Sequence, residues 1–237
     1  MYDYQAPKRR RGRKALIWVA VVLVLLVGLD FGAKAYAQNV AASQLQKRGF
    51  PSKPNVSIAG FPFLTQVITR SFQQITITSS NIPAGPLKIT SLRVVADNVH
   101  LSGSFQSGTA GPLHGTIVIS LGSIGTALSA AGPLASFVAG GSKILNIKSV
   151  GNNEVKGSLN IFGGAVSASA VWQVSRAGPA DINLHKVSSS GVFSSLPNDI
   201  TLPVSSLPAG LQLSGGLNAS ASGITAHVYA RSVTFGS

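Results

Sequence analysis

The sequence predicts an α+β fold: antiparallel strands dominate the chain, a few helices pack on them, and a membrane segment precedes the folded domain. Three observations predict this class. Only 11% of the 237 residues are charged, and Gly (26) and Pro (12) are frequent, which is typical of exported β-rich domains. Apolar and polar residues alternate repeatedly with a period of two, as in half-buried strands. Near the N-terminus, a basic cluster precedes fifteen consecutive apolar residues.

The N-terminal segment begins with a basic tail, residues 1–14, which we expect to stay in the cytoplasm because positive charge orients the apolar segment behind it. Residues 15–37 follow as a signal anchor or a signal peptide. The sequence AYA at 35–37 has the small-x-small form of a cleavage site, and fifteen apolar residues suit a cleaved signal better than the ~20 of a full span. The helical pattern nevertheless continues to Lys47, with Gly49 as a stop signal, and this favours a retained anchor.

A single domain of residues 38–237 should therefore lie outside the cytoplasm. It is either attached to the cell membrane by one span or secreted to the periplasm after cleavage near Ala37. The chain has no cysteine, so this domain depends on its core for stability and is not a lipoprotein acylated after the apolar segment. About 200 residues are enough for such a core.

The charge of the domain disfavours nucleic acid as a partner. From Gln38 onward, twelve Lys and Arg stand against four Asp and Glu, a net charge of +8. The basic residues are scattered singly with few aromatic residues between them, unlike a nucleic-acid interface. Two interpretations stay open: attraction to an anionic membrane surface or lipid headgroup, and the solubility of a sparsely charged surface.

The alternating segments predict about ten strands, mostly antiparallel neighbours with one dry and one wet face. The clearest is AVSASAVWQVS, in which Val171 alone breaks the alternation. Its dry face holds Val166, Ala168, Ala170, Trp172 and Val174. Shorter patterns are Ile75 and Ile77; Val99, Leu101 and Phe105; Ile117, Ile119 and Leu121; Val155, Leu159 and Ile161; and Ile224, Ala226, Val228 and Ala230. Turn signals separate the strands: GNN at 151–153, SGG at 214–216 and SG at 222–223.

Two further segments have helical periodicity. The helix that continues the N-terminal segment should present one face made of Ala37, Val40, Ala41 and Leu45. Segment 123–141 should form two short helical turns packed on the dry face of the sheet, because Gly132-Pro133 interrupts it. Its apolar residues at helical spacing are Ile124, Leu128, Leu134 and Val138.

The sequence GFPFLTQ at 60–66 predicts an unusually apolar bend, in which Gly60 and Pro62 turn the chain. Its apolar residues, together with segment 123–141 and small residues on the strand faces, could line an interior or its mouth. The alternative is an ordinary core closed by a phenylalanine-rich plug. The candidates for the lining are Phe61, Phe63, Leu64, Leu128, Leu134 and Phe137, with small residues at Ala168, Ala170, Ala226 and Ala230.

Groups that could catalyse a reaction or bind a metal are scarce in the exported part. The four carboxylates are far apart in sequence, and the four histidines show no metal-ligand spacing. No G-x-S-x-G motif occurs. We therefore expect a protein that is not an enzyme and that needs no metal or other cofactor. A hydrolase assembled by the fold from distant Ser, His and Asp residues is kept as an alternative. The histidines are His100, His114, His185 and His227.

The order of three segments resembles the actinobacterial LmeA-like family of phospholipid-binding exported proteins. The segments are an anchor that ends at Asp30 and continues as a helix, then NVSIAGFPFLTQVITRSFQQITIT, and late in the chain LPAGLQLSGGLNASASGITAHVYARSVTF. The most specific part is Val56–Gln66, of the type V-x-I-x-G-F-P-F-L-T-Q. The resemblance spans nearly the whole exported chain.

This resemblance implies a strongly curved antiparallel sheet or open barrel, similar to tubular lipid-binding folds, with an apolar cavity for acyl chains. It implies that phospholipid, of the phosphatidylinositol type in the named member, is the ligand, and it makes the lining candidates lipid-binding residues. It also implies an accessory or carrier role in lipomannan and lipoarabinomannan assembly. The alternative from another class is an envelope scaffold or interaction module that binds wall polysaccharide or a partner protein through a polar β-face.

Overall fold

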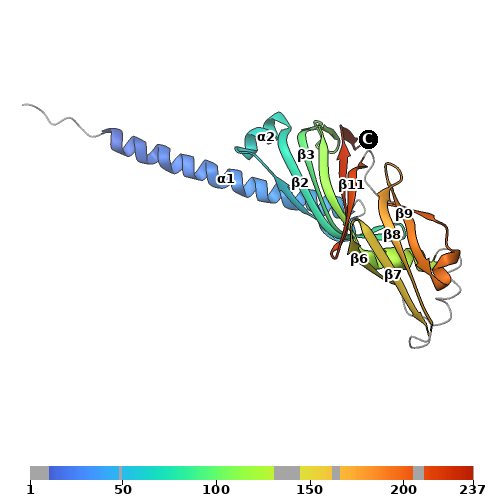
Figure 1. Cartoon of the computed structure of the whole chain (residues 1–237). Helices are drawn as coiled ribbons and strands as arrows, with labels where there is room; N and C mark the ends of the chain where they lie inside the picture. Colours follow the sequence, from blue (N-terminus) through green and yellow to red (C-terminus); the bar gives the residue numbers. More distant parts are fainter. Residues whose placement is uncertain (1–10, 48–49, 131–144, 162–165, 205–210, 237) are drawn as a thin grey trace, which may run out of the picture.

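The computed structural model describes residues 11–47, 50–130, 145–161, 166–204 and 211–236, and it shows a long helix that projects from a β-rich domain (Figure 1). The α-helices of the described chain are α1 (Arg11–Lys47), α2 (Phe63–Thr69) and α3 (Leu121–Ala130), and the 3₁₀ helix η2 covers Gly191–Ser195. The strands are β1 (Asn55–Ile58), β2 (Ser71–Ala84), β3 (Leu87–Leu101), β4 (Gly108–Ala110), β5 (Leu113–Ile119), β6 (Asn146–Gly151), β7 (Glu154–Ile161), β8 (Val166–Arg176), β9 (Asp181–Ser190), β10 (Asp199–Pro203), β11 (Gln212–Ser220), β12 (Gly223–Ala230) and β13 (Val233–Phe235). The predicted α+β class is confirmed.

The strands are divided between two open antiparallel sheets. Sheet A has the order β1-β2-β3-β5-β12-β11, and the short strands β4 and β13 extend it beside β3. Sheet B has the order β10-β9-β8-β7-β6. Sheet B lies at the end of the domain away from the projecting part of α1 (Figure 1). The predicted antiparallel neighbours are thus observed, but a single continuous sheet is not.

Helix α1 is continuous over 37 residues and ends at Lys47, as its sequence predicts. It is long and apolar enough to cross a membrane, and residues 19–29 are exposed along their whole length. Contact with the domain begins at Asp30, which is buried. Ala33 and Ala37 then pack against sheet A, at spacings of three and four residues that place them on one helical face. Val40 was expected on this face but is exposed.

The larger core cluster fills the space between the two sheets and α3. Trp172 and Phe193 are fully buried in it, with their rings edge to face at a centroid distance of 5.7 Å. The small residues of sheet B make room for these rings: a Cβ on Gly157 would lie 2.6 Å from the Trp172 ring. Ala168 and Ala170 are buried in the same cluster. The small-residue face of sheet B is therefore filled by aromatic side chains.

Strand β11, at the edge of sheet A, is tied to sheet B by side-chain hydrogen bonds. The backbone N–H of Ala219 donates to the side-chain oxygen of Asn153 at 2.9 Å, and the hydroxyl of Ser149 donates to the Ala219 carbonyl at 3.0 Å. The guanidinium of Arg176 donates to the Leu213 carbonyl at 2.6 Å. These bonds satisfy backbone groups that an edge strand would otherwise expose.

A second, smaller cluster lies between α1, α2 and sheet A. Its buried members are Ile58, Phe63, Phe72, Val99 and Ala110. Ala33 and Ala37 of helix α1 pack against this cluster. The described residues therefore form two apolar clusters, and of these the smaller one includes the helix that leads into the apolar N-terminal segment.

Three strand assignments differ from the structure. Leu121 begins α3 instead of continuing β5, since an apolar residue fits the period of either element. Phe105 lies beyond β3 in a turn, with a left-handed backbone (φ 59°) and an exposed ring. The SGG at 214–216 does not separate strands but lies inside β11, at a β-bulge where the pairing with β12 shifts register. The GNN and SG turns are confirmed.

The helical segment is confirmed in its first half, because α3 contains Ile124 and Leu128, both fully buried. Leu134, Phe137 and Val138, and the expected second helical turn, lie outside the described residues.

Candidate functional site

The apolar bend at 60–66 is confirmed as a turn, and it leads into a helix that the sequence did not predict. Gly60 has φ +97°, in the left-handed region, and the Phe61–Pro62 peptide bond is cis. The Gln66 side chain closes the turn: its amide N–H donates to the Ala59 carbonyl at 3.1 Å, and its oxygen accepts the Gln73 N–H at 3.1 Å. The signal that could have indicated α2 is the spacing of Phe63, Gln66 and Val67, at i, i+3 and i+4.

Asp30 of α1 supplies the N-terminal cap of α2 from a distance of more than thirty residues in sequence. Its carboxylate accepts the backbone N–H of Phe63 at 2.9 Å and that of Leu64 at 2.7 Å. Pro62, at the N-cap position, has no side-chain oxygen for this purpose. A buried carboxylate in an apolar helix is thus matched to two N–H groups that would otherwise lack partners.

The three bend candidates have different surroundings. Phe63 is 2% exposed and packs on Phe72, with ring centroids 6.1 Å apart. Phe61 is 60% exposed and stacks on Phe31 of α1 at 6.2 Å, and Leu64 is 37% exposed. Only Phe63 is therefore part of the packed interior.

Leu128 belongs to the other cluster, between the sheets, where it is 1% exposed. The structure does not bring it together with the bend residues. Ile68 of α2 was not a candidate, although it is the most exposed large apolar side chain of the described residues, at 81%.

The apolar face of sheet A is incompletely covered near α1. Ile58, Ile75, Ala96 and Leu113 are paired in register across β1, β2, β3 and β5, so their side chains form one row on this face. Ile58 is buried, but the other three are only partly buried, although they pack on the α1 cluster. In the neighbouring row, Ile77 is also only partly buried.

The equivalent face of the central strands of sheet B is completely covered. The inward-facing apolar residues described on β7, β8 and β9 are at most 3% exposed: Val155, Leu159, Ala168, Ala170, Trp172, Val174, Ile182 and Leu184. The contrast places the accessible apolar surface of the interior on the part of sheet A that faces α1.

Two strands of sheet A, β3 and β5, approach each other closely beside that surface. A Cβ on Gly115 would lie 2.2 Å from the Arg93 carbonyl oxygen of the neighbouring strand β3, so only glycine allows the two strands to approach in this way. Gly115 interrupts the row that contains Ile77 and Val94, where a side chain would otherwise fill the space. A close approach of this kind, at a glycine within a strand, is typical of a locally bent sheet.

The opposite, polar face of sheet A carries an open groove of about 480 Å³. Arg93, Thr116, His227 and Ser214 are paired in register across β3, β5, β12 and β11, and they line it together with His114 and Tyr229. The groove is chemically distinct from the apolar face, because it offers basic and hydrogen-bonding side chains on a solvent-exposed surface.

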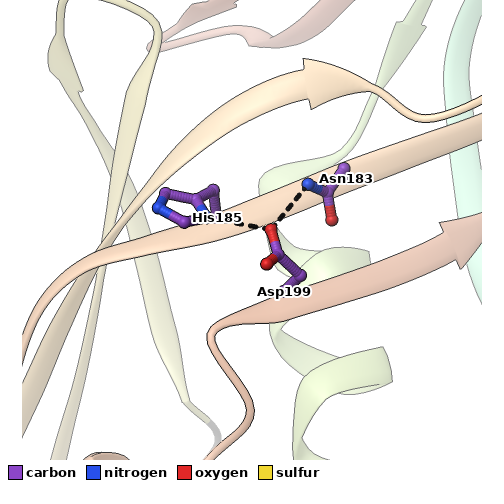
Figure 2. Close-up of polar contacts among 3 residues, drawn as sticks. All are labelled: Asn183, His185 and Asp199. Carbon is purple, nitrogen blue, oxygen red and sulfur yellow. Dashed lines mark hydrogen bonds and ion pairs between the residues drawn. The ribbon is translucent and has the colours of Figure 1, made fainter.

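The best-defined polar cluster lies on the edge of sheet B (Figure 2). The Asp199 carboxylate accepts a hydrogen bond from the Asn183 side-chain amide at 2.9 Å and contacts Nδ1 of His185 at 2.9 Å. The Asn183 hydrogen bond, followed by the His185 hydrogen bond, lowers the pKa of Asp199 below its ordinary value, and a small desolvation effect opposes them. The His185 and Asp199 side chains are both more than half exposed. The cluster is solvated and does not form a pocket for a substrate.

The other histidines also fail to complete a catalytic triad within the part of the chain that the structure describes. His114 lies 3.5 Å from Asp97, and His100 lies 3.3 Å from the Ser71 hydroxyl. One pair lacks a nucleophile and the other lacks an acid. Among the same residues, no group of three or more His, Asp or Glu side chains could hold a metal ion. The hydrolase alternative therefore receives no support from these residues.

Comparison with known proteins gives one match. The sequence model of a family described as LmeA-like phospholipid-binding matches residues 28–228, which is most of the chain. No curated protein and no solved structure shows significant similarity. The match begins just before Asp30 and includes α2, sheet B and all of sheet A except β13 and the last two residues of β12.

Proposed function

The chain belongs to the LmeA-like phospholipid-binding family, and on this premise we propose that it is a non-enzymatic phospholipid-binding protein of the cell envelope. The observation that carries the proposal is the accessible apolar face of sheet A. Ile75, Ile77 and Ala96 point inward yet stay only partly buried, whereas the inward faces of β7, β8 and β9 in sheet B are fully packed. An acyl chain lying between α1 and these residues would complete their burial.

The energy available from such a contact is sufficient for binding without any catalytic group. Each buried CH₂ group contributes about 0.8 kcal/mol, so enclosing eight of them gives roughly 6 kcal/mol. Because this hydrophobic contact is non-directional, it distinguishes lipids by the length of the acyl chain more than by the headgroup.

The lining residues suggested by the sequence have different roles in this proposal. Phe61 and Leu64 are exposed and would form the entrance to the apolar face. Phe63 supports them from the packed cluster. Leu128 lies in the cluster between the sheets and would only shape the far wall. Leu134 and Phe137 remain candidates outside the described residues.

We further propose that α1 is retained as a single-pass anchor and that residues 38–237 form one extracytoplasmic domain, with residues 1–14 in the cytoplasm. The support is that cleavage after Ala37 would remove Asp30, the cap of α2, and two alanines of the smaller cluster. Intact-mass analysis of the protein purified from native membranes tests this. A mature chain that begins at Gln38 would contradict it.

The lipid-binding proposal is tested by native mass spectrometry and lipid extraction of the full chain in mild detergent. We expect about one phospholipid per chain, a ratio that follows from one accessible apolar face. Ala96→Phe would fill the face with a ring and should lower lipid occupancy. Thr76→Phe is the matched control, because Thr76 lies on the adjacent strand and is paired with Val95, so its side chain points to the polar face.

The unfolding temperature of Ala96→Phe distinguishes a loss of lipid binding from misfolding of the variant. If the space is open to a lipid chain, Ala96→Phe should fold with unchanged unfolding temperature in the delipidated protein. If the space is closed, overpacking costs about 1–3 kcal/mol. A destabilised variant that still carries lipid, or a wild-type chain that never carries any, would contradict the proposal.

The finer role that we propose is an accessory or carrier factor in lipoglycan assembly, with phosphatidylinositol-type lipids as ligands. Basic side chains scattered over the domain suit an anionic headgroup. Competition between phosphatidylinositol, phosphatidylglycerol and phosphatidylcholine for the delipidated protein tests the headgroup preference. Equal binding of all three lipids would contradict a headgroup preference and would show that the protein recognises the acyl chain alone.

A second candidate function is an envelope scaffold that binds wall polysaccharide or a partner protein. The polar groove on sheet A favours it, because Tyr229 is exposed beside Arg93 and two histidines. Pull-down of wall glycan by the wild type but not by Tyr229→Ala would support this function. Unchanged lipid occupancy in that variant would show that the two faces act separately.

A further inference from the structure

Four apolar side chains are exposed where α1 leaves the domain, and we call them the α2 apolar surface. They are Phe31, Phe61, Leu64 and Ile68. Phe31 and Phe61 stack on each other, and Leu64 and Ile68 lie one turn apart on the same face of α2. Isolated apolar residues are common on protein surfaces, but four exposed apolar side chains on two joined elements, two of them stacked phenylalanines, are typical of an interaction surface.

The α2 apolar surface continues directly from the apolar part of α1. The fifteen apolar residues 15–29 reach only about 22 Å as a helix, whereas the hydrocarbon core of a bilayer is about 30 Å thick. Phe31 follows this run after a single residue, Asp30. Figure 1 shows α2 at the end of the domain from which the N-terminal part of α1 projects. A short span draws flanking apolar groups into the membrane.

Asp30 fixes this surface relative to the span. Its two hydrogen bonds hold the first turn of α2 against α1, so α2 cannot swing away without exposing two N–H groups and a carboxylate. The same bonds make the carboxylate tolerable near the membrane, because its oxygens are satisfied by backbone donors.

Two basic residues flank the α2 apolar surface. Lys34 lies one turn after Asp30 on α1, and Arg70 ends α2 with an exposed side chain. Apolar residues at the centre with basic residues at the edge are typical of segments that lie in the interface of a bilayer with anionic lipids.

From these observations we propose that the α2 apolar surface lies in the interfacial layer of the same bilayer that α1 crosses. The domain therefore rests on the membrane at a second point, beside the proposed entrance to the apolar face of sheet A. The inference rests on the proposed span of α1, and it names the lipid bilayer as the occupant of this surface. A lipid entering the domain would then move from the leaflet into the protein without crossing water.

The absence of cysteine from the chain allows a site-specific test with single-cysteine variants. Ile68→Cys in the full chain is labelled with an environment-sensitive fluorophore and reconstituted into vesicles of phosphatidylcholine and phosphatidylglycerol. Val187→Cys is the matched control: it is also an exposed β-branched residue, but it lies on β9 in sheet B. Quenching is measured with spin-labelled lipid and with aqueous iodide.

We expect the label at 68 to be quenched several-fold more by spin-labelled lipid than the label at 187, and several-fold less by iodide. Equal iodide quenching at both positions, without quenching by lipid, would overturn the inference. Protection at 68 that disappears as the protein-to-lipid ratio is lowered would also overturn it, because it would assign the surface to a second copy of the chain.

Native mass spectrometry of the same labelled proteins distinguishes this inference from the proposed function. Bound phospholipid together with an exposed label at 68 overturns the membrane contact and leaves lipid binding standing. A protected label at 68 without bound phospholipid supports the membrane contact and overturns the proposed lipid binding.

Discussion

The carboxylate of Asp30 lies 2.7 Å from the backbone nitrogen of Leu64 and thereby joins the long helix α1 to the first turn of α2. Removing this cap should loosen α2. An N-cap is worth about 0.5–2 kcal/mol, so Asp30→Ala should raise amide exchange in α2 by roughly 2–30-fold, and Asp30→Asn should raise it less because one acceptor is kept. Hydrogen exchange of the peptide that contains residues 63–69 measures this. Asp199→Ala, far from α2, is the control, and equal exchange in all variants would contradict the role of Asp30.

Phe63 and Phe61 should respond oppositely to truncation. Phe63 is packed in the smaller cluster, so Phe63→Ala should cost about 3–5 kcal/mol in the free energy of unfolding, and Phe63→Asp should prevent folding. Phe61→Ala should cost less than about 1.5 kcal/mol, the value of its stacking contact with Phe31, but should slow lipid uptake from vesicles. Denaturant unfolding in detergent and a fluorescent-lipid uptake assay measure the two effects. A stable Phe63→Ala variant that has lost uptake would reassign Phe63 to the entrance.

Gly60 should not tolerate a side chain, for two separate reasons. Its φ of +97° is unfavourable for alanine, and the added Cβ would lie 2.5 Å from the side-chain nitrogen of Gln66. We expect Gly60→Ala to lower the free energy of unfolding by about 2–3 kcal/mol. Gly151→Ala isolates the first effect, because Gly151 has φ +92° and open space around it, and it should cost about 1 kcal/mol. Equal losses in thermal unfolding would show that Gln66 moves aside freely.

The Asp199 cluster predicts a pH dependence at the acid end. Because hydrogen bonds lower the folded-state pKa of Asp199, its contribution to stability is present above its unfolded pKa and is lost as the pH falls through the lowered value. NMR titration should place its pKa below the ordinary value. Asn183→Ala should raise that pKa more than His185→Ala does, because the Asn183 hydrogen bond is the larger cause. The stability difference between wild type and Asp199→Asn should vanish once the pH lies below the lowered pKa of Asp199. A larger effect of His185→Ala would contradict this order.

The sequence predicts those parts of the fold that depend on local periodicity. Strand β8 and the inward positions of β12 follow from alternation, and α1 follows from its apolar helix signal and its stop at Lys47. Leu121 could not be assigned, because its apolar side chain fits both the last position of a strand and the first turn of a helix. Helix α2 was missed for another reason: Pro62 directly before it and the Thr and Gln residues within it are typical of a loop.

The candidate site depends on contacts that periodicity does not contain. Asp30 and Phe63 are 33 residues apart, and no local pattern pairs a carboxylate with the N-terminus of a distant short helix. The separation into two sheets is likewise set by long-range packing around Trp172 and Phe193. GFPFLTQ could be recognised as an apolar bend, but whether its residues face the core or the solvent depends on how α2 lies against α1.

The continuity of α1 has a consequence for how far the domain can travel. One uninterrupted helix of 37 residues, about 55 Å long, contains both the apolar segment and the surface that packs on sheet A, so no flexible linker separates them. A domain held in this way keeps a fixed height and tilt above the bilayer. If α1 spans the membrane as proposed, the protein can deliver a lipid only to a partner in or on the same membrane, and transport to the outer layers of the envelope would require a separate carrier.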